Sequence, residues 1–422
     1  MEKLDTICVQ AGYNPKSGEP RVTPIYQSTT YYYDKASELA DLFDLKAEGF
    51  FYSRLANPTV DVFEKKVAAL EGGTGAIATA SGQSASLFSV LNVCGAGDNI
   101  VVSSMIYGGT FNLFNVTLRK LGIDTRFFEP TDSKEDIEKL IDDKTRLIFV
   151  ETIANPSIVV IDFDKISAIA KKYNILLAVD NTLATAALCR PKDFGANLVV
   201  YSSSKYLDGH AVALGGVLVD LGNFDFKGNA RYPEFNSPDE SYHGLVYAEL
   251  GGTAYLTKAR AQLMRDLGAM MSPQNAFLTN LGTETLSLRM EKHSQNAKKV
   301  AEFLSKSDKI EWIKHPSLES DKYHDLAQKY LPNGQGGMMS FGVKGGRAKA
   351  EKFMENLKMI AIVTHVADAR SCCLHPASTT HRQLSEKELQ LCGITDNLIR
   401  LSVGIENADD IIADIKQSLE QL

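Results

Sequence analysis

The sequence lacks the marks of several broad protein classes. It has no block of basic residues and a formal net charge of −7, so we do not expect nucleic acid as a partner. No apolar run is long enough to span a bilayer, so no membrane partner is expected either. The start, MEKLDTICVQ, is polar and has no apolar core segment, which argues against a secretory signal.

Cysteine and histidine patterns of metal sites are also missing. The eight histidines include no HExxH pair, so we predict no metal site. The six cysteines lack metal-ligand spacing, and in a chain of this length we expect reduced thiols and a cytoplasmic location rather than a disulfide scaffold. These cysteines are Cys8, Cys94, Cys189, Cys372, Cys373 and Cys392.

An alternation of apolar and amphipathic segments is what the sequence does contain. Amphipathic runs such as SKEDIEKLIDD and FDKISAIAKKYN separate short β-branched stretches at 99–104, 147–152, 175–181, 198–204 and 215–220. Short buried strands that alternate with helices predict an α/β fold with a mostly parallel sheet covered on both faces. A length of 422 residues favours more than one domain.

Composition divides the chain into three parts. Residues 1–60 are rich in tyrosine, proline and turn formers, which predicts an extended N-terminal arm. Residues 61–255 carry the alternating pattern and are expected to form the large α/β domain. Long helical runs followed by short strands such as GMMSFGV and NLIRLSVGIE predict an α+β domain over 256–422. The stretch 222–247 is expected to be a long loop, often a lid over a site.

Reactive side chains follow two successive predicted strands. Asp180 comes just after ILLAV, and Lys205 comes just after LVVYSSS, with Ser202 and Ser204 beside it. Each of these residues alone is ordinarily a turn former or a solvated side chain. Because open parallel sheets bind ligands at the carboxyl ends of their strands, we expect these side chains to share one site.

Two earlier turns supply complementary chemistry. Gly82 and Gln83 open a helix in TASGQSASLF, where free N–H groups and the helix dipole favour a phosphate. Tyr107, in MIYGGTF, offers a ring on which a ligand can stack, although such a tyrosine is more often core packing. An imine-forming lysine, an acid, an anion cradle and an aromatic platform are the four features that pyridoxal 5'-phosphate (PLP) requires.

With these residues in view, the chain resembles the Cys/Met-metabolism family of PLP-dependent enzymes, which has the PLP-dependent type I aminotransferase fold. Within that family it is most similar to the O-acetylhomoserine sulfhydrylase (O-acetylhomoserine aminocarboxypropyltransferase) branch. The likeness covers essentially the whole chain. It is carried by the motifs YSRLANPT, ASGQSA, IYGGT, AVDNT, SSSKY, HPASTTH and IRLSVGIE.

The resemblance implies a role for each matching residue. Lys205 would hold PLP as a Schiff base and move protons, Asp180 would pair with the pyridine nitrogen, and Tyr107 would stack on the ring. The remaining cofactor contacts would be made by Gly82, Gln83, Ser202 and Ser204 to the phosphate, Tyr52 and Arg54 to the phosphate of a neighbouring subunit, and Asn155 to the ring hydroxyl. The substrate-binding residues would be Arg400, Ser371 and Asn155.

The positions of Arg400 and Arg54 can also be interpreted without the resemblance. Arg400 lies in an apolar run, LIRLSVGI, where a charge needs a partner, so it either forms an internal salt bridge or binds a substrate carboxylate. Arg54 in the arm would ordinarily be a surface residue. An arm that reaches another subunit would explain Arg54, and the resemblance implies a homo-oligomer, a tetramer of two active dimers.

The implied reaction is a γ-replacement that converts O-acetyl-L-homoserine and sulfide to L-homocysteine and acetate in methionine biosynthesis. Three positions distinguish this chain from other branches of the family. Methionine γ-lyases usually carry cysteine at the position of Gly109, and lyases tend to have methionine at the position of Gln83. Cystathionine-processing relatives often have glutamate at the position of Arg370. Cys372–Cys373 departs from the aliphatic pair expected there, and we interpret it as small buried hydrophobes.

Several alternatives remain open from the sequence. They are γ-elimination or replacement of the methionine γ-lyase or cystathionine γ-synthase/lyase type, O-succinylhomoserine as substrate, a Schiff-base aldolase without PLP, and a noncatalytic binding protein that retains the fold. The presence of Lys205, Asp180 and Arg400 together argues against the last.

Overall fold

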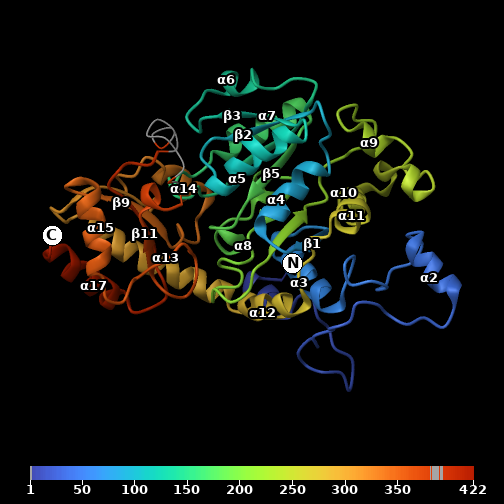
Figure 1. Ribbon diagram of the computed structural model, residues 1–422, viewed down its shortest axis with the longest axis horizontal. Coiled ribbons are helices and arrows are strands. Elements are labelled where there is room, and N and C mark those ends of the chain that lie inside the picture. The colour runs from blue at the N-terminus through green and yellow to red at the C-terminus, as the bar shows by residue number, and fades with distance from the viewer. Residues whose placement is uncertain (1, 381, 383–388, 390–392) are drawn as a thin grey trace.

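The computed structural model describes residues 2–380, 382, 389 and 393–422. Cys392 and His381, the last residue of HPASTTH, lie outside this part of the chain. Figure 1 shows an elongated molecule, with α2 at one end, the helices α15 and α17 at the other, and the large sheet between them.

Seven strands form the large sheet, in the order β1-β7-β6-β5-β4-β2-β3. They are β1 (Gly75–Thr79), β2 (Asn99–Ser103), β3 (Asp124–Phe128), β4 (Thr145–Glu151), β5 (Leu176–Asp180), β6 (Leu198–Tyr201) and β7 (Gly216–Asp220). Strand β7 runs antiparallel to both neighbours, and every other pair is parallel. The mostly parallel sheet is therefore confirmed. Sequence analysis did not single out β1 or β3, because β1 is built of small residues and β3, at the sheet edge, carries charges.

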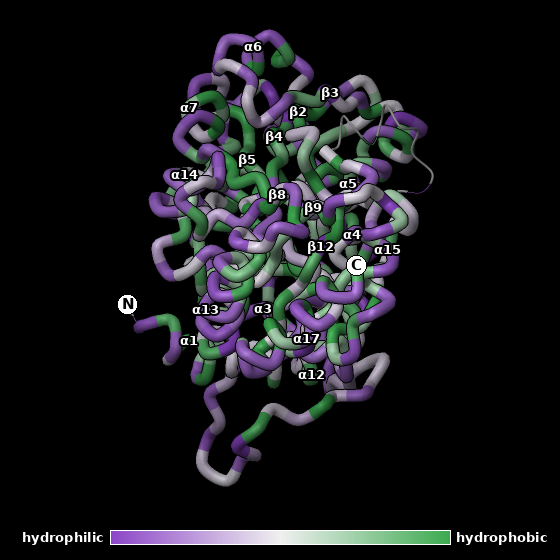
Figure 2. Tube along the Cα trace, turned by 90° about the vertical axis from the view of Figure 1, so that its left-hand side faces the viewer, coloured by the Kyte–Doolittle hydropathy of each residue, from purple (hydrophilic) through white to green (hydrophobic). Residues whose placement is uncertain are grey.

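Alternate residues of the central strands face two separate apolar cores. On β5, Leu177 and Val179 pack in one core, and Leu176 and Ala178 pack in the other. Helices α3 (Pro58–Glu71) and α7 (Phe163–Tyr173) cover the first core, and α4 (Gly82–Leu91) covers the second. Figure 2 shows apolar strands between helices that are largely hydrophilic. This three-layer arrangement explains why the strands read as continuous apolar runs.

Helix boundaries follow from local capping chemistry. Helix α3 begins after Asn57, whose side chain accepts a hydrogen bond from the Thr59 amide (3.0 Å), and ends at Gly72, whose φ is 69°. Helix α7 begins after Asp162 and ends at Asn174 in the left-handed region. The predicted helix at 133–143 is shorter than expected, because α6 spans only Lys134–Glu138.

The C-terminal part forms a second sheet of five strands, in the order β10-β11-β12-β9-β8. These are β8 (Ile310–Lys314), β9 (Met338–Val343), β10 (Ala361–Ile362), β11 (Cys372–Leu374) and β12 (Leu398–Ser402). Helices α13 (Leu286–Leu304), α15 (Gly346–Asn356) and α17 (Ala408–Glu420) share one apolar core with this sheet. Strands β9 and β12 match the predicted stretches GMMSFGV and NLIRLSVGIE.

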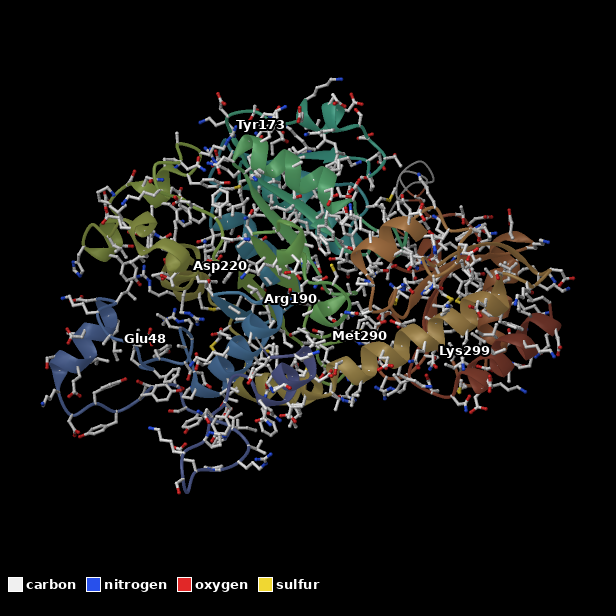
Figure 3. All side chains as sticks on the ribbon, turned by 180° about the vertical axis from the view of Figure 1, so that it is seen from behind. Glu48, Tyr173, Arg190, Asp220, Met290 and Lys299 are labelled. Carbon is white, nitrogen blue, oxygen red and sulfur yellow. The ribbon has the colours of Figure 1, made fainter. Side chains whose placement is uncertain are left out.

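Helix α13 joins the two parts of the molecule. Met290, near its start, packs in the core of the large sheet, whereas Val300, near its end, packs in the C-terminal core. Figure 3 labels Met290 and Lys299 along this helix. Because one rigid helix contributes to both cores, it holds the C-terminal sheet at a defined position beside the large sheet.

The first sixty residues are not uniformly extended, which corrects the expectation of a single arm. Helix α1 (Leu4–Gln10) places Ile7 and Cys8 in the core beside α3. The chain then projects away from the body and forms α2 (Ala36–Phe43). Glu48, which follows α2, lies at the opposite end of the molecule from Lys299 (Figure 3). The two apolar side chains of α1 explain why it docks.

The segment 222–247 was expected to form a lid over a site. It forms no lid over the active-site cavity of its own chain, because none of its residues lines that cavity. This segment carries the short turns α9 (Pro233–Asn236) and η3 (Glu240–Tyr242), and its aromatic residues pack in the second core. The Tyr232 hydroxyl donates to the Arg146 carbonyl (2.6 Å) and accepts from the Leu176 amide (2.9 Å). Both partners lie at the starts of their strands, so the segment covers the sheet edge opposite Asp180.

Candidate active site

A cavity of about 350 Å³ gathers most of the predicted site residues. It lies where β4, β5 and β6 end, and β12 of the C-terminal sheet supplies part of its wall. The predicted residues that line it are Gly82, Gln83, Tyr107, Asn155, Asp180, Ser202, Ser204, Lys205 and Arg400. The carboxyl edge of the parallel strands is therefore where they meet.

Lys205 contributes the amine of this cavity. It follows β6, and its amide donates to the Ser202 carbonyl (3.3 Å) while its carbonyl accepts from the Gly209 amide (2.7 Å). Burial, followed by the positive charge of Arg400, lowers the pKa of Lys205 to about 8. An amine with this pKa is neutral, and hence nucleophilic, far more often than an exposed lysine near neutral pH.

Two buried carboxyl groups lie side by side at the strand ends. Asp180 of β5 and Glu151 of β4 are register partners. Burial raises the pKa of Asp180 to about 6, and burial together with the Asp180 charge raises the pKa of Glu151 well above its usual value. Neither forms an ion pair with any described residue. Such a pair favours a ligand that brings positive charge, as a protonated pyridine nitrogen does.

Both carboxyl groups are held in place by hydrogen bonds. Asp180 Oδ1 accepts from the Thr182 amide (2.9 Å). Glu151 Oε1 accepts from the Tyr107 amide (2.7 Å), and its Oε2 accepts from the Asn155 amide (3.3 Å). Glu151 thereby orients two predicted site residues. Sequence analysis did not single it out, although it follows the apolar run LIFV just as Asp180 follows ILLAV.

The start of α4 is suited to an anion. Ser81 caps this ten-residue helix by accepting from the Ser84 amide (3.2 Å). The amides of Gly82 and Gln83 donate to no acceptor in the part of the chain that is described, as expected of a first helical turn. A side chain at Gly82 would place its Cβ 2.7 Å from the Ser202 Cβ. Only glycine therefore lets the helix and the strand end approach this closely.

The polar side chains around the start of α4 differ in whether their hydrogen-bonding groups are already engaged. The Ser202 hydroxyl makes no hydrogen bond with the described residues, so it is available to a phosphate. The Ser204 hydroxyl accepts from the Gly215 amide (2.9 Å) and donates to the Gly215 carbonyl (3.2 Å), so its proton is already engaged. The Gln83 side chain donates to Thr110 Oγ1 (3.1 Å), which leaves its main-chain amide for an anion.

Arg400 contributes a buried guanidinium to the cavity wall. Its side chain donates to Asn155 Oδ1 (3.4 Å) and to the Thr364 carbonyl (3.2 Å), and only 4% of its surface is exposed. It forms no ion pair within the described residues, so the alternative of an internal salt bridge finds no partner in that part of the chain. A buried cation on the cavity wall without an anion favours a ligand carboxylate.

Three predicted residues do not reach this cavity. The Ser371 hydroxyl donates to Glu406 Oε2 (2.9 Å) and accepts from the Gly404 amide (2.9 Å), so its proton is already engaged and it is not available to bind a substrate. Tyr52 and Arg54 line a separate hollow of about 360 Å³, where the guanidinium carbon lies 5.2 Å from the tyrosine ring centroid. These two side chains are not available to Lys205 of the same chain.

The C-terminal part adds wall residues that sequence analysis missed: Thr364, His365, Val366 and Thr380. The first three lie between β10 and β11, where no strand or helix pattern marks them. Next to them, burial raises the pKa of Cys372 to about 11 and that of Cys373 to about 12, so both remain thiols at neutral pH. No cluster of three or more metal-ligating side chains occurs in the described ranges.

The residues of the cavity fit PLP. The unpartnered amides of α4 and the free Ser202 hydroxyl suit its phosphate, and the uncompensated Asp180 suits its ring nitrogen. Lys205, with its lowered pKa, suits its aldehyde. The unpaired Arg400 then remains for the carboxylate of an amino-acid substrate.

Comparison with known proteins gives consistent results over the full chain. The model of the family described as "Cys/Met metabolism PLP-dependent enzyme" matches residues 5–420. An O-acetyl-L-homoserine sulfhydrylase of Leptospira meyeri is 44% identical over 431 residues, which cover 100% of this chain and 97% of that protein. A homocysteine synthase of Schizosaccharomyces pombe is 46% identical over 423 residues, which cover 99% of this chain and 98% of that protein.

A solved structure agrees with this comparison. A Campylobacter jejuni protein described as an O-acetylhomoserine (thiol)-lyase superposes with a TM-score of 0.96 at 42% identity, covering 99% of this chain and 100% of that one. That protein carries N'-pyridoxyl-lysine-5'-monophosphate at position 205 of its own chain.

Proposed function

This chain belongs to the Cys/Met metabolism PLP-dependent enzyme family, and on that premise we propose that it converts O-acetyl-L-homoserine and sulfide to L-homocysteine and acetate. It is a PLP-dependent enzyme that acts on small molecules. One observation carries the proposal: a single cavity holds a lysine amine together with two carboxyl groups and a guanidinium that form no ion pair with any described residue. Full-length relatives at 44% and 46% identity, named for this chemistry, support the choice of reaction.

Each polar group of the cavity has a task in this reaction. PLP, when bound, supplies an electron sink for charge that develops on the substrate carbons. Asp180 holds a proton at the ring nitrogen by its negative charge. Arg400 binds the substrate α-carboxylate. Lys205 Nζ, released from the cofactor by the substrate amine, accepts the Cα proton and then moves protons along the substrate, so that acetate leaves from Cγ and sulfide adds there.

Gly109 supports replacement over elimination. A Cβ at this position would lie 2.5 Å from Tyr107 Cε1, so any larger residue displaces the ring. Methionine γ-lyases usually carry cysteine here, which implies a different position of the ring in them. Gly109 is therefore consistent with a sulfhydrylase, and elimination is the alternative that the assay must distinguish.

We infer that the active form is a homo-oligomer, a tetramer of two active dimers. Tyr52 and Arg54, on a projecting segment away from their own Lys205, have a role in cofactor binding only if a neighbouring chain's phosphate meets them. We also infer a cytoplasmic location, which is in keeping with the free buried thiols of Cys8, Cys94 and Cys189. In the described chain no helix has the length and apolarity needed to cross a membrane.

The test is an incubation of the purified protein with O-acetyl-L-homoserine, with and without sulfide. Homocysteine that forms only with sulfide, together with little 2-oxobutanoate, is the expected result. Release of 2-oxobutanoate and ammonia regardless of sulfide would make the protein a lyase. O-succinyl-L-homoserine run in parallel identifies the acyl group, and a Lys205→Ala variant controls for chemistry outside the site.

A further inference from the structure

His365 lies directly beside the reactive amine. Its Nδ1 is 3.1 Å from Lys205 Nζ, which is hydrogen-bond distance. It reaches this position from the segment between β10 and β11, in the C-terminal part of the chain. The reaction proposed above assigns no role to this imidazole.

The other ring nitrogen of His365 faces an acid. Nε2 is buried and makes no hydrogen bond with any described residue, and it lies 3.8 Å from Asp368 Oδ2. Asp368 is itself buried, and its other oxygen, Oδ1, accepts from the Arg370 amide (2.7 Å). A small movement of the ring would complete an Nε2–H···Oδ2 bond. The amine, the imidazole and the carboxylate therefore follow one another in a line of hydrogen-bonding groups.

The segment that carries His365 is held against the lysine loop. The Ala369 amide donates to the Gly209 carbonyl (2.9 Å), and Arg370 Nη2 donates to the His210 carbonyl (2.7 Å). The Ala367 amide donates to Ser402 Oγ (2.8 Å), with φ of 66° at Ala367. Alanine seldom adopts this backbone conformation. These contacts fix the position of the imidazole relative to Lys205.

We propose that His365 is the proton acceptor for Lys205 and that Asp368 positions its ring, so that the lysine amine is freed for attack on the cofactor aldehyde. With Nε2–H directed at Asp368, the lone pair of Nδ1 faces Lys205. Lys205–NH₃⁺ transfers one proton to Nδ1 and becomes the neutral amine, and His365 becomes the imidazolium. The total charge of the pair is unchanged, and no other bond is broken.

Charges around the imidazole favour this assignment. Burial, followed by the positive charge of Lys205, lowers the pKa of His365, so the ring is neutral and able to accept at neutral pH. Asp368 stabilises the imidazolium once it forms. Asp208, Arg400 and Cys372 also act on the pair; Arg400 opposes the imidazolium and Asp208 supports it. Arg370 Nε lies 3.4 Å from Asp368 Oδ1 and offsets part of the charge of that carboxylate.

The experiment measures cofactor loading rather than turnover. Cofactor-free full-length protein is mixed with PLP, and the absorbance of the lysine–cofactor imine is followed by stopped flow over a range of pH. His365→Ala is expected to slow imine formation by about 100-fold, the lower end of the range for one acid–base group. Added imidazole is expected to restore the rate of this variant in proportion to its concentration, without changing the wild-type rate.

Asp368→Asn tests the positioning role with the imidazole retained. Because the Arg370 amide requires an oxygen acceptor, the new amide must turn its NH₂ toward Nε2, which then becomes the acceptor and leaves the proton on Nδ1. This variant is expected to load slowly without rescue by imidazole. His210→Asn, an exposed histidine on the neighbouring loop, is the matched control and should load at the wild-type rate.

The outcomes separate this inference from the proposed function. Wild-type rates in His365→Ala, or a slow rate that imidazole does not improve, overturn the proton-acceptor role, and His365→Asn replaces the alanine variant if that variant does not fold. Wild-type rates in Asp368→Asn overturn the positioning role. A wild-type chain that forms no imine with PLP would instead refute the role of Lys205, on which the inference rests.

Discussion

Replacement of Gly109 by alanine tests whether the position of the Tyr107 ring governs the reaction. A Cβ at this position would lie 2.5 Å from Tyr107 Cε1 and 3.1 Å from Cζ. Ordinary van der Waals contact begins at 3.4 Å. The edge of the ring must therefore move by about 0.9 Å, because the glycine lies in the first turn of α5 (Gly108–Asn112) and has little freedom to yield.

The expected effect is on rate, not on stability. Tyr107 is 44% exposed, so its ring can swing outward without opening a buried cavity. A displacement of about 1 Å in a positioning group can reduce a rate by about 100-fold. We therefore expect kcat/KM for sulfide-dependent homocysteine formation to fall by about 10- to 100-fold, while the melting temperature stays within a few degrees of that of the wild type.

The assay compares Gly109→Ala with Gly95→Ala, in which the new Cβ would come no closer than 3.8 Å to another group. Both variants are tested for homocysteine, 2-oxobutanoate and thermal unfolding. A wild-type kcat/KM in Gly109→Ala would refute the link between the glycine and the ring position. A loss of activity that parallels a loss of stability would show that the glycine serves the fold instead.

Three further predictions concern the cofactor site. Lys205→Met should abolish turnover, and it should stabilise the cofactor-free protein at neutral pH by up to about 3 kcal/mol, because burial holds the folded-state pKa near 8 against 10.5 unfolded. As the pH rises from about 8 to 10.5, the free energy of unfolding of the wild type should increase until it equals that of the variant. Urea unfolding in which the two proteins do not converge over this pH range would contradict the argument. Arg54→Ala should weaken PLP binding, measured by dialysis and absorbance, with unchanged thermal unfolding, and full retention of PLP would exclude the shared site. Glu151→Gln should also weaken PLP binding, by about tenfold, since the Tyr107 and Asn155 amides donate to different oxygens of Glu151 and the glutamine NH₂ would face one of them; wild-type affinity would show that neither bond matters.

The central part of the site was predictable from short stretches of sequence. Asp180, Ser202 and Lys205 each follow an apolar run, and Gly82 opens a helix just after another. In a parallel sheet, residues that follow strands converge on one edge whatever their separation along the chain. Knowledge of the strands was therefore enough to bring these residues together, and the same rule applies to Glu151.

Local sequence did not predict where a segment packs when more than one packing partner was possible. The length of 222–247 indicated a functional loop, but which edge of the sheet its aromatic residues cover depends on the core they complete. Ser371 has a hydroxyl that could serve a substrate, yet Glu406 and Gly404 engage it. Helix α1 docks because Ile7 and Cys8 find a place in the core beside α3.

The second wall of the cavity was decided by tertiary structure alone. His365 and Asp368 lie in a segment without periodicity, and they approach Lys205 only because α13 and the contacts at Gly209 hold the C-terminal sheet against the large sheet. The sequence likewise left Arg400 with either an internal or an external partner, and only the folded chain shows that no described acid faces it. Strand order brings residues together within one sheet, whereas the distance between the two sheets depends on how the surfaces between them pack, which no short stretch of sequence encodes.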